Sequence, residues 1–202
     1  MTRVVAVDPD APARAAIDEA AAVLRADGLV AFPTETFYGL GAAALRPGAA
    51  RRIFEVKGRP AGKPLLVLVD SIAMVEGLAT TISPRARALM ARHWPGALTL
   101  VVPARTEIPA EVTAGTGTLG VRLSAHPVAR ALVTALGGPV TAPSANPAER
   151  VPPTTAARVV AYFGDAVDFV LDGGATPGGE PSTVLDVTVD PPRVIRAGAV
   201  KV

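Results

Sequence analysis

The feature that most constrains the fold is a series of short apolar runs separated by Ala-rich segments. Residues typical of helix ends flank these Ala-rich segments. Each run has three to five residues, a length typical of buried strands rather than of helices. The strands and helices interleave irregularly, which favours an α/β fold with a mixed sheet. We expect strands at residues 29–32, 65–69, 98–102, 119–123, 140–142, 167–171, 183–187 and 193–195.

Helix boundaries are marked by polar capping residues, Pro and Gly. Asp10 is the expected N-cap of a helix over about 12–26 that Gly28 closes. Ser71 and Ser83 are expected to cap two further helices. The remaining helices are expected at about 47–56, at 127–136, and from Thr154 or Thr155 to about 163.

Length and composition limit the class of protein. The 202 residues show no composition shift, so we expect a single domain over residues 1–202. The absence of Cys excludes disulfides, thiolate metal sites and a Cys nucleophile. No apolar run approaches the roughly 18 residues of a membrane span, and the first residues do not form a signal peptide. These features predict a cytoplasmic protein with no membrane partner.

The basic residues are unevenly chosen. The net charge of +2 is too small to indicate nucleic-acid binding by itself. Of the 20 basic residues 17 are Arg, and the only Lys residues are Lys57, Lys63 and Lys201. Asn146 is the only Asn, two positions after Ser144. A Lys in so Arg-rich a chain is a candidate for a site that needs a compact, strongly hydrated cation. Chance is an equally good explanation for the pair Lys57 and Lys63, and for the pair Ser144 and Asn146.

Residues 57–64 (KGRPAGKP) form the densest candidate site. Lys57, Arg59 and Lys63 lie among two Gly and two Pro, between an expected helix and a buried strand. Gly admits close backbone approach and Pro stiffens a loop, so these cations could bind a polyphosphate. A solvated basic turn is the alternative. The spacing is not that of a Walker A loop.

Two hydroxyl-bearing segments follow expected strands. Residues 33–41 (PTETFYGLG), read as a polar turn, carry two Thr and a Glu, and residues 143–147 (PSANP) contain Ser144 and Asn146. Ligands of open α/β sheets bind beyond the carboxyl ends of strands, so both segments could hold a polar substrate. The alternatives are a capped turn and an Asn-Pro turn.

Two Arg residues stand in or at the end of strands. Arg122 interrupts an apolar strand, where its charge must pair with an internal acid or face a substrate carboxylate, two equally good explanations. Arg196 is either a phosphate ligand or a surface charge. His93 and His126 form no metal pattern, and no Ser-His-Asp arrangement is present. With few candidate bases, the residues suit charge neutralisation of phosphates better than proton abstraction.

Taken together, these segments resemble the YrdC family of threonylcarbamoyl-AMP synthases. The family's KxR and SxN motifs fall on Lys57, Arg59, Ser144 and Asn146. The matching stretches occur in the family's order: PTETFYGLG at 33–41, KGRPAGKPL at 57–65, WPGALTLV at 94–101, GVRLSAHP at 120–127, APSANP at 142–147, LDGG at 171–174, STVLD at 182–186 and IRAG at 195–198.

The resemblance implies an α/β domain with a twisted mixed sheet and flanking helices around a deep, basic cleft that holds ATP beside L-threonine. Carried over by position, threonine would contact Thr36, Arg122 and Ser182. The catalytic signature would consist of Lys57, Arg59, Ser144 and Asn146, and ATP would contact Arg59, Lys63, Thr118, Ser144 and Arg196.

Two positions depart from the family pattern. Leu68 stands where several members have a His, and Pro152 replaces a hydroxyl expected to touch the nucleotide. Each change removes one expected substrate contact. In length, the chain resembles the short, single-domain members of the family.

The resemblance implies a reaction that joins L-threonine, bicarbonate and ATP into threonylcarbamoyl-AMP and pyrophosphate, for N6-threonylcarbamoyladenosine in tRNA. Mg²⁺ is expected to accompany ATP, and no permanently bound cofactor or protein-held metal is expected. The expected partner is the complex that transfers the threonylcarbamoyl group to tRNA. Weak RNA binding, including double-stranded RNA, is a further expectation.

Three other hypotheses remain open at this stage. Low net charge and sparse aromatic residues disfavour a pure RNA-binding module. A relative that makes another carbamoyl adenylate, as in hydrogenase-maturation proteins, is disfavoured because no zinc-finger or acylphosphatase segment is fused to the chain. A structural domain with a vestigial site is disfavoured by the intact KxR and SxN motifs.

Overall fold

The fold is built on two mixed β-sheets. A computed structural model describes residues 1–58 and 62–202, so Arg59 of the KxR motif lies outside the described residues. The first sheet has the order β1-β8-β2-β3, and the second has the order β10-β9-β5-β6-β4-β7. The strands are β1 (Arg3–Ala6), β2 (Val30–Pro33), β3 (Tyr38–Gly41), β4 (Leu66–Leu68), β5 (Leu98–Pro103), β6 (Thr118–Arg122), β7 (Val140–Thr141), β8 (Phe169–Asp172), β9 (Thr183–Asp186) and β10 (Arg193–Arg196).

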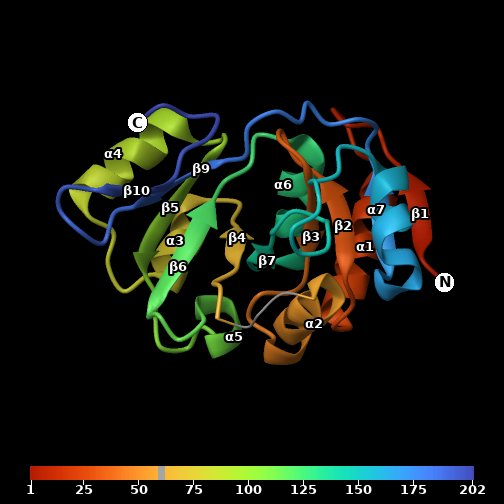
Figure 1. Cartoon of the computed structure of the whole chain (residues 1–202), viewed down its shortest axis with the longest axis horizontal. Helices are drawn as coiled ribbons and strands as arrows, with labels where there is room; N and C mark the ends of the chain where they lie inside the picture. The colour runs from red at the N-terminus through yellow and green to blue at the C-terminus, as the bar shows by residue number, and fades with distance from the viewer. Residues whose placement is uncertain (59–61) are drawn as a thin grey trace.

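Both sheets combine parallel and antiparallel pairs, which confirms the expected mixed α/β architecture. Strands β1, β8 and β2 pair in parallel, whereas β3 runs antiparallel to β2. In the second sheet β5 is parallel to β9 and antiparallel to β6. The sheets meet where β3 passes β7, through antiparallel bridges from Gly39 to Ser144 and from Ala43 to Val140 (Figure 1). The mixed β-structure expected from the sequence thus forms two sheets that meet at this point.

The helices flank the two sheets and begin largely where their caps predict. They are α1 (Arg14–Arg25), α2 (Pro47–Lys57), α3 (Ile72–Leu78), α4 (Pro84–His93), α5 (Ala110–Thr113), α6 (Pro127–Leu136) and α7 (Ala156–Phe163). The side chains of Ser71, Ser83 and Thr155 each accept a backbone N–H at a helix N-terminus, as expected. No described helix is long and apolar enough to cross a lipid bilayer.

The expected cap at Asp10 is wrong. Helix α1 begins at Arg14, and Ala13 occupies the cap position without a side-chain hydrogen bond. The Asp8 carboxylate instead accepts the backbone N–H groups of Asp10 and Ala11, at 2.9 and 3.1 Å. This local turn holds the segment before the helix in a non-helical conformation.

The segment 33–41, expected to be a turn, includes the strand β3 in its second half. Only the first part is a turn, in which the Thr34 hydroxyl accepts the Phe37 N–H at 3.3 Å and donates to the Phe37 carbonyl at 2.7 Å. Tyr38 then begins β3, and its side chain is fully buried. A Cβ on Gly39 or Gly41 would lie 3.2 or 2.8 Å from the Phe32 ring. These two Gly residues suggested a loop, but they let β3 pass under an aromatic ring on β2.

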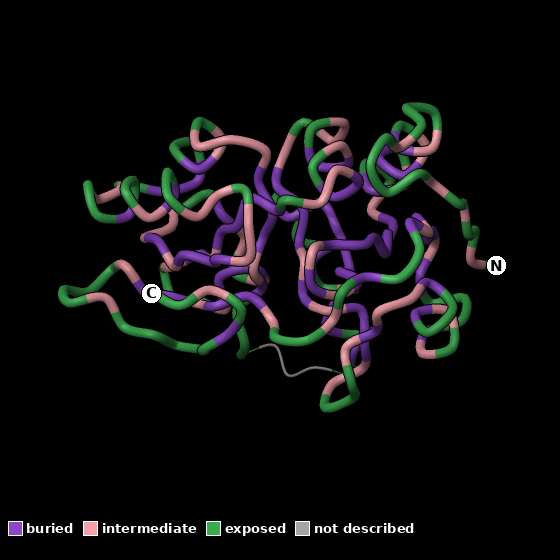
Figure 2. Tube along the Cα trace, turned by 90° about the horizontal axis from the view of Figure 1, so that it is seen from above, coloured by how far each residue is buried: buried purple, intermediate pink, exposed green. Residues whose placement is uncertain are grey.

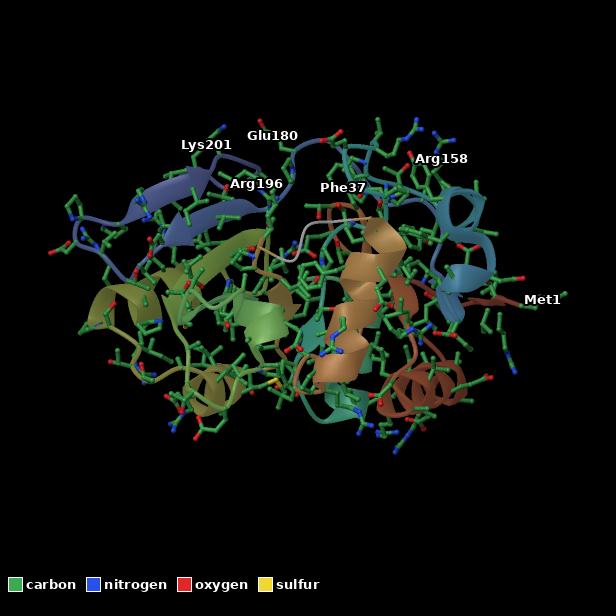
Figure 3. All side chains as sticks on the ribbon, turned by 60° about the horizontal axis from the view of Figure 1, so that its bottom comes forward. Met1, Phe37, Arg158, Glu180, Arg196 and Lys201 are labelled. Carbon is green, nitrogen blue, oxygen red and sulfur yellow. The ribbon has the colours of Figure 1, made fainter. Side chains whose placement is uncertain are left out.

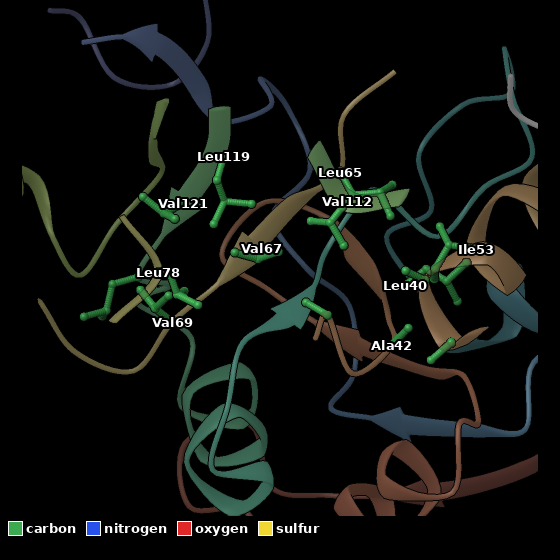
Figure 4. Close-up of a cluster of buried hydrophobic side chains, with 14 of the residues drawn as sticks. Leu40, Ala42, Ile53, Leu65, Val67, Val69, Leu78, Val112, Leu119 and Val121 are labelled. Carbon is green, nitrogen blue, oxygen red and sulfur yellow. The ribbon is translucent and has the colours of Figure 1, made fainter. Parts of the chain in front are cut away.

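The hydrophobic core extends across both sheets, as the buried interior in Figure 2 indicates. One cluster joins Leu40 of β3 to Val67 of β4 and Val121 of β6 (Figure 4). A second cluster lies under α1 and α6 and includes Leu68. Leu, Val and Ala supply most of this core. The two sheets are therefore held together by packed aliphatic side chains, which contribute on the order of 25 cal/mol for each Å² removed from water.

Two segments without regular secondary structure lie next to β9 of the second sheet. Residues 173–182 run from β8 to β9 along the top of the view in Figure 1. The chain end then folds back on the start of β9, where the Ala199 N–H donates to the Pro181 carbonyl at 2.9 Å. The Thr183 hydroxyl donates to the Val200 carbonyl at 2.6 Å. Gly198 directly precedes these two contacts and packs against the backbone of Pro181 and Ser182.

We predict that Gly198→Ala destabilises the fold, because the added Cβ would lie 2.1 Å from the Pro181 carbonyl oxygen. The free energy of unfolding should fall by about 1–3 kcal/mol, as for other overpacked positions. Urea denaturation measures this change. Gly77→Ala is the matched control, since nothing lies within 4 Å of its Cβ position. Equal stability of the Gly198→Ala and wild-type proteins would contradict the prediction.

Candidate functional site

A cavity of about 740 Å³ opens between β3 of the first sheet and β5, β6, β9 and β10 of the second. Figure 3 labels two of its lining residues, Phe37 in the turn before β3 and Arg196 of β10. The lining residues are Thr34, Thr36, Phe37, Tyr38, Gly39, Lys57, Pro64, Leu65, Leu66, Thr99, Val101, Thr116, Thr118, Gly120, Arg122, Ala142, Pro143, Ser144, Pro152, Pro181, Ser182, Val184, Asp186, Arg193, Ile195 and Arg196.

Most of the residues expected at the site line this cavity. They are Thr36, Lys57, Thr118, Arg122, Ser144, Ser182 and Arg196. Lys63 is exposed and Asn146 is buried, and neither is among the lining residues that the structure describes. Arg59 falls in the part of the chain that is not described. The roles assigned to all of these residues remain predictions.

Lys57 ends α2 and holds the SxN segment. Its side chain is only 5% exposed, and its ammonium donates to the backbone carbonyls of Ser144 and Asn146. The Ala148 N–H donates in turn to the Lys57 carbonyl at 2.8 Å. A buried ammonium requires such acceptors, because an unpaired charge inside a protein is strongly unfavourable. Lys57 therefore fixes the backbone that presents Ser144 to the cavity.

Asn146 organises the loop behind the cavity wall. Its amide nitrogen donates to the carbonyls of Pro147 and Arg150, at 2.8 and 2.7 Å. These bonds tie down the turn that precedes Pro152, which does line the cavity. Among the described residues, no donor contacts its buried Oδ1. The geometry thus gives Asn146 a positioning role.

Arg122 has an internal acid as its partner. Its Nη2 lies 2.8 Å from Glu35 Oε1, and its Nε donates to the Gly96 carbonyl at 3.2 Å. The Nη2 atom faces the Glu35 carboxylate, so the charge of this buried guanidinium is paired inside the protein. Of the two partners that the sequence left open, the structure shows the internal acid, and a substrate carboxylate as a further partner of Arg122 stays a prediction.

Glu35 was not singled out as a site residue. Its carboxylate also accepts the Ser124 hydroxyl and, at 3.2 Å, the Ala125 N–H. Burial would raise the pKa of Glu35, but the charge of Arg122 and the Ser124 hydroxyl outweigh it, so the pKa lies below its ordinary value. The carboxylate is consequently ionised at neutral pH.

Arg196 lies across the cavity on β10. It donates from Nε and Nη2 to the Ser182 carbonyl, at 3.0 and 2.7 Å, and from Nη2 to the Ser182 hydroxyl at 2.9 Å. The hydroxyls of Ser182 and Thr99 lie 3.0 Å apart. Desolvation and the charge of Arg122 lower the pKa of Arg196. Two guanidinium groups thus repel each other across the cavity, and an anion between them would relieve this repulsion.

Several other lining residues have no clear signal in the sequence. The Tyr38 hydroxyl donates to the Gly174 carbonyl at 2.7 Å, and burial, with the charge of Asp172, raises the pKa of Tyr38. Asp186 pairs with Arg193 at 3.1 Å. Thr99 could have been found, because it is the one hydroxyl within the apolar run 98–102. The others depend on contacts between distant segments.

The two departures from the expected pattern have different positions. Leu68 packs in the hydrophobic cluster with Phe32 and Leu132, whereas Pro152 lines the cavity. Among the described residues, no group of three or more His, Asp or Glu side chains could hold a metal ion. Position 152 therefore faces the cavity, whereas the side chain at position 68 faces the hydrophobic core.

The fold and the cavity define a class of α/β protein in which hydroxyl and guanidinium groups from two mixed sheets face one binding site. A sequence profile of the Sua5/YciO/YrdC family, described as "Telomere recombination", matches residues 22–198, so the chain belongs to this family.

Relatives and a solved structure agree with this assignment. A threonylcarbamoyl-AMP synthase of Pyrococcus abyssi is 45% identical over 179 residues, which is 89% of this chain and 53% of the relative. One of Thiobacillus denitrificans is 40% identical over 176 residues, 87% of this chain and 92% of the relative. The structure of P. abyssi Sua5 complexed with L-threonine matches with a TM-score of 0.94 and 43% identity, over 98% of this chain and 58% of that one. The chain thus spans about half the length of the P. abyssi proteins.

We predict that Lys57→Met destabilises the protein, because two carbonyl oxygens lose a charged donor. The free energy of unfolding should fall by about 2–4 kcal/mol. Lys201→Met is the control, since Lys201 is exposed and lies 3.9 Å from Glu180; its effect should stay below about 0.5 kcal/mol. Indistinguishable urea midpoints for the two variants would refute a structural role for Lys57.

Because of Glu35, the free energy of unfolding is expected to depend on pH. Because its folded pKa is below its unfolded value, its stabilising contribution is present above the unfolded pKa and is lost as pH falls through the folded pKa. We predict that wild-type stability falls more steeply than that of Glu35→Gln between about pH 6 and pH 3. Chemical denaturation at stepped pH values measures both curves. Parallel curves would show that Glu35 has the same pKa in both states.

Proposed function

We propose that this protein condenses L-threonine, bicarbonate and ATP into threonylcarbamoyl-AMP and pyrophosphate, for N6-threonylcarbamoyladenosine formation in tRNA. The observation that carries the proposal is the composition of the cavity wall. Thr36, Ser144, Arg122, Ser182 and Arg196 come from five separated motifs and face one space. The 40% identity to a synthase of which this chain covers 92% supports the same conclusion.

L-threonine would bind between Thr36, Arg122 and Ser182. The amino-acid carboxylate suits Arg122, a buried cation that lines the cavity. Hydroxyl groups of Thr36 and Ser182 can bond the polar groups of the amino acid. The similarity to P. abyssi Sua5, solved with L-threonine, supports this assignment.

ATP would occupy the remaining part of the cavity. Thr118, Ser144 and Arg196 line this part of the cavity. Arg59, outside the described residues, and Lys63 would contribute further cations for the phosphates. Lys57 and Asn146 complete the signature by fixing the SxN loop. Mg²⁺ would enter as part of the MgATP substrate.

The chemistry relies on positioning and charge neutralisation. The neutral amine of threonine reacts with CO2 derived from bicarbonate, and the amine proton and the hydroxide that bicarbonate releases leave together as water. A carbamate oxygen of the resulting N-carboxythreonine attacks the α-phosphorus of ATP. The bond to the bridging oxygen breaks, and pyrophosphate leaves. Fixed cations such as Arg196 would stabilise the charge that develops on the phosphoryl oxygens. Asp186, a carboxylate on the cavity wall, is paired with Arg193, so it is a poor candidate for a general base.

The partners expected from the sequence belong to the same proposal. The product would pass to the complex that transfers threonylcarbamoyl to tRNA, and weak binding of double-stranded or other RNA would assist this transfer. Residues 1–202 would act as one domain, and the reaction would take place in the cytoplasm.

Pyrophosphate release by the purified protein with MgATP tests this function. We predict release only when both L-threonine and bicarbonate are present. Arg122→Met should raise the KM for L-threonine at least about tenfold, since a charge-assisted bond is lost, with little change in the KM for ATP. Lys201→Met serves as the control, because the Lys201 side chain is exposed and is not among the described lining residues.

Release without threonine and bicarbonate, or no release at all, would overturn the proposal. Binding of RNA in low salt without threonine-dependent release would favour an RNA-binding module instead. Release that depends on another amine would favour a different carbamoyl adenylate.

A further inference from the structure

Glu35 stands directly behind the cavity wall. It follows Thr34 in the turn before β3, and its side chain is 20% exposed but is not among the described lining residues. Its neighbours Thr34 and Thr36 do line the cavity. A carboxylate in this place affects the site through the groups that it contacts, above all through Arg122.

The contacts of Glu35 leave it little capacity for proton transfer. Oε1 receives the Arg122 Nη2 ion pair and the Ala125 N–H, and Oε2 accepts the Ser124 hydroxyl. A carboxylate has about four lone-pair sites, so three of them face fixed donors or a cation. This arrangement holds the carboxylate in one orientation and keeps it ionised. It suits an anchor better than a base.

Arg122 is anchored on two sides by segments distant in sequence. Glu35 contacts Nη2, and the Gly96 carbonyl accepts from Nε at 3.2 Å. The Gly96 carbonyl is itself held in place, because the Gly96 N–H donates to the Leu123 carbonyl at 2.8 Å. The guanidinium plane is therefore fixed before any ligand arrives, which reduces the ordering cost of binding.

Glu35 also offsets part of the positive charge that faces the cavity. Arg122 and Arg196 both face it, and their like charges oppose each other. A carboxylate beside Arg122 stabilises that charge from behind and leaves the cavity side available. Loss of Glu35 would free the Arg122 guanidinium to move away from Arg196.

We propose that Glu35 is a positioning residue that sets the orientation of the Arg122 guanidinium for the carboxylate of the amino-acid substrate. This inference rests on the proposed function. It assigns the affinity for L-threonine, rather than the chemical step or the affinity for ATP, to a residue outside the cavity wall.

Glu35→Gln tests this role, since it keeps the size of the side chain and removes its charge. Pyrophosphate release by the variant should show a KM for L-threonine raised about tenfold or more, as expected for a lost charge-assisted contact. The KM for ATP and the kcat at saturating threonine should change less than about twofold, because the lost contact to threonine is equally strong in the ground state and the transition state. Glu55→Gln, an exposed position on α2, should behave as wild type.

A double-mutant cycle separates positioning from general damage. If Glu35 acts through Arg122, adding Glu35→Gln to Arg122→Lys should raise the threonine KM by less than about threefold beyond Arg122→Lys alone. Ser124→Ala keeps the carboxylate but removes one of its anchors. It should raise the threonine KM to a smaller extent, and it keeps the inference testable if Glu35→Gln does not fold.

The outcomes are distinct for the two proposals. Threonine-independent release by the wild-type protein would sink the proposed function. Threonine-dependent release by the wild type, with an unchanged threonine KM in Glu35→Gln, would overturn only the role of Glu35. So would full additivity in the cycle, or an equal rise in the KM values of threonine and ATP.

Discussion

The buried ammonium of Lys57 is the interaction on which the cavity wall depends. It joins the end of α2 to the carbonyls of Ser144 and Asn146, and the Lys57 carbonyl accepts the Ala148 N–H in return. A charge this buried is stable only when its donors find acceptors. Carbonyl groups in a loop after a short strand would otherwise be free to move. This exchange therefore fixes the loop that contains Ser144, and with it the path of the chain to Pro152.

Each guanidinium of the site is likewise held by a partner within the protein. Arg122 is held by Glu35, Arg193 by Asp186 and Arg196 by Ser182. In each case a partner outside or at the edge of the cavity orients the cation before a ligand binds. Preorganised charges stabilise an anionic ligand more than mobile ones, because less ordering is required on binding. The cavity wall is thus rigid in its charged groups and carries hydroxyls between them.

This arrangement suits an adenylation better than proton-transfer chemistry. The carboxylates near the site, Glu35 and Asp186, are both paired with Arg residues. They can orient cations but are poor bases. In the proposed reaction, the protein holds an amino acid, a carbamate and a polyphosphate in line and offsets their charges. Hydroxyl groups and guanidinium groups meet these needs.

The sequence by itself determined the α/β class, most strand and helix positions and the motifs that line the cavity. Caps at Ser71, Ser83 and Thr155 are local signals, because a side chain there bonds to the backbone a few residues away. The tertiary structure decided what those motifs contact. The Lys57 ammonium contacts a carbonyl almost 90 residues away, and Arg122 pairs with Glu35. The Asn146 amide donates to a carbonyl of its own loop and does not line the cavity. Gly39 and Gly41, read as turn residues, instead make room for the Phe32 ring. These outcomes depend on long-range packing and on charges that must be paired once they are buried, and neither is set by residues adjacent in sequence.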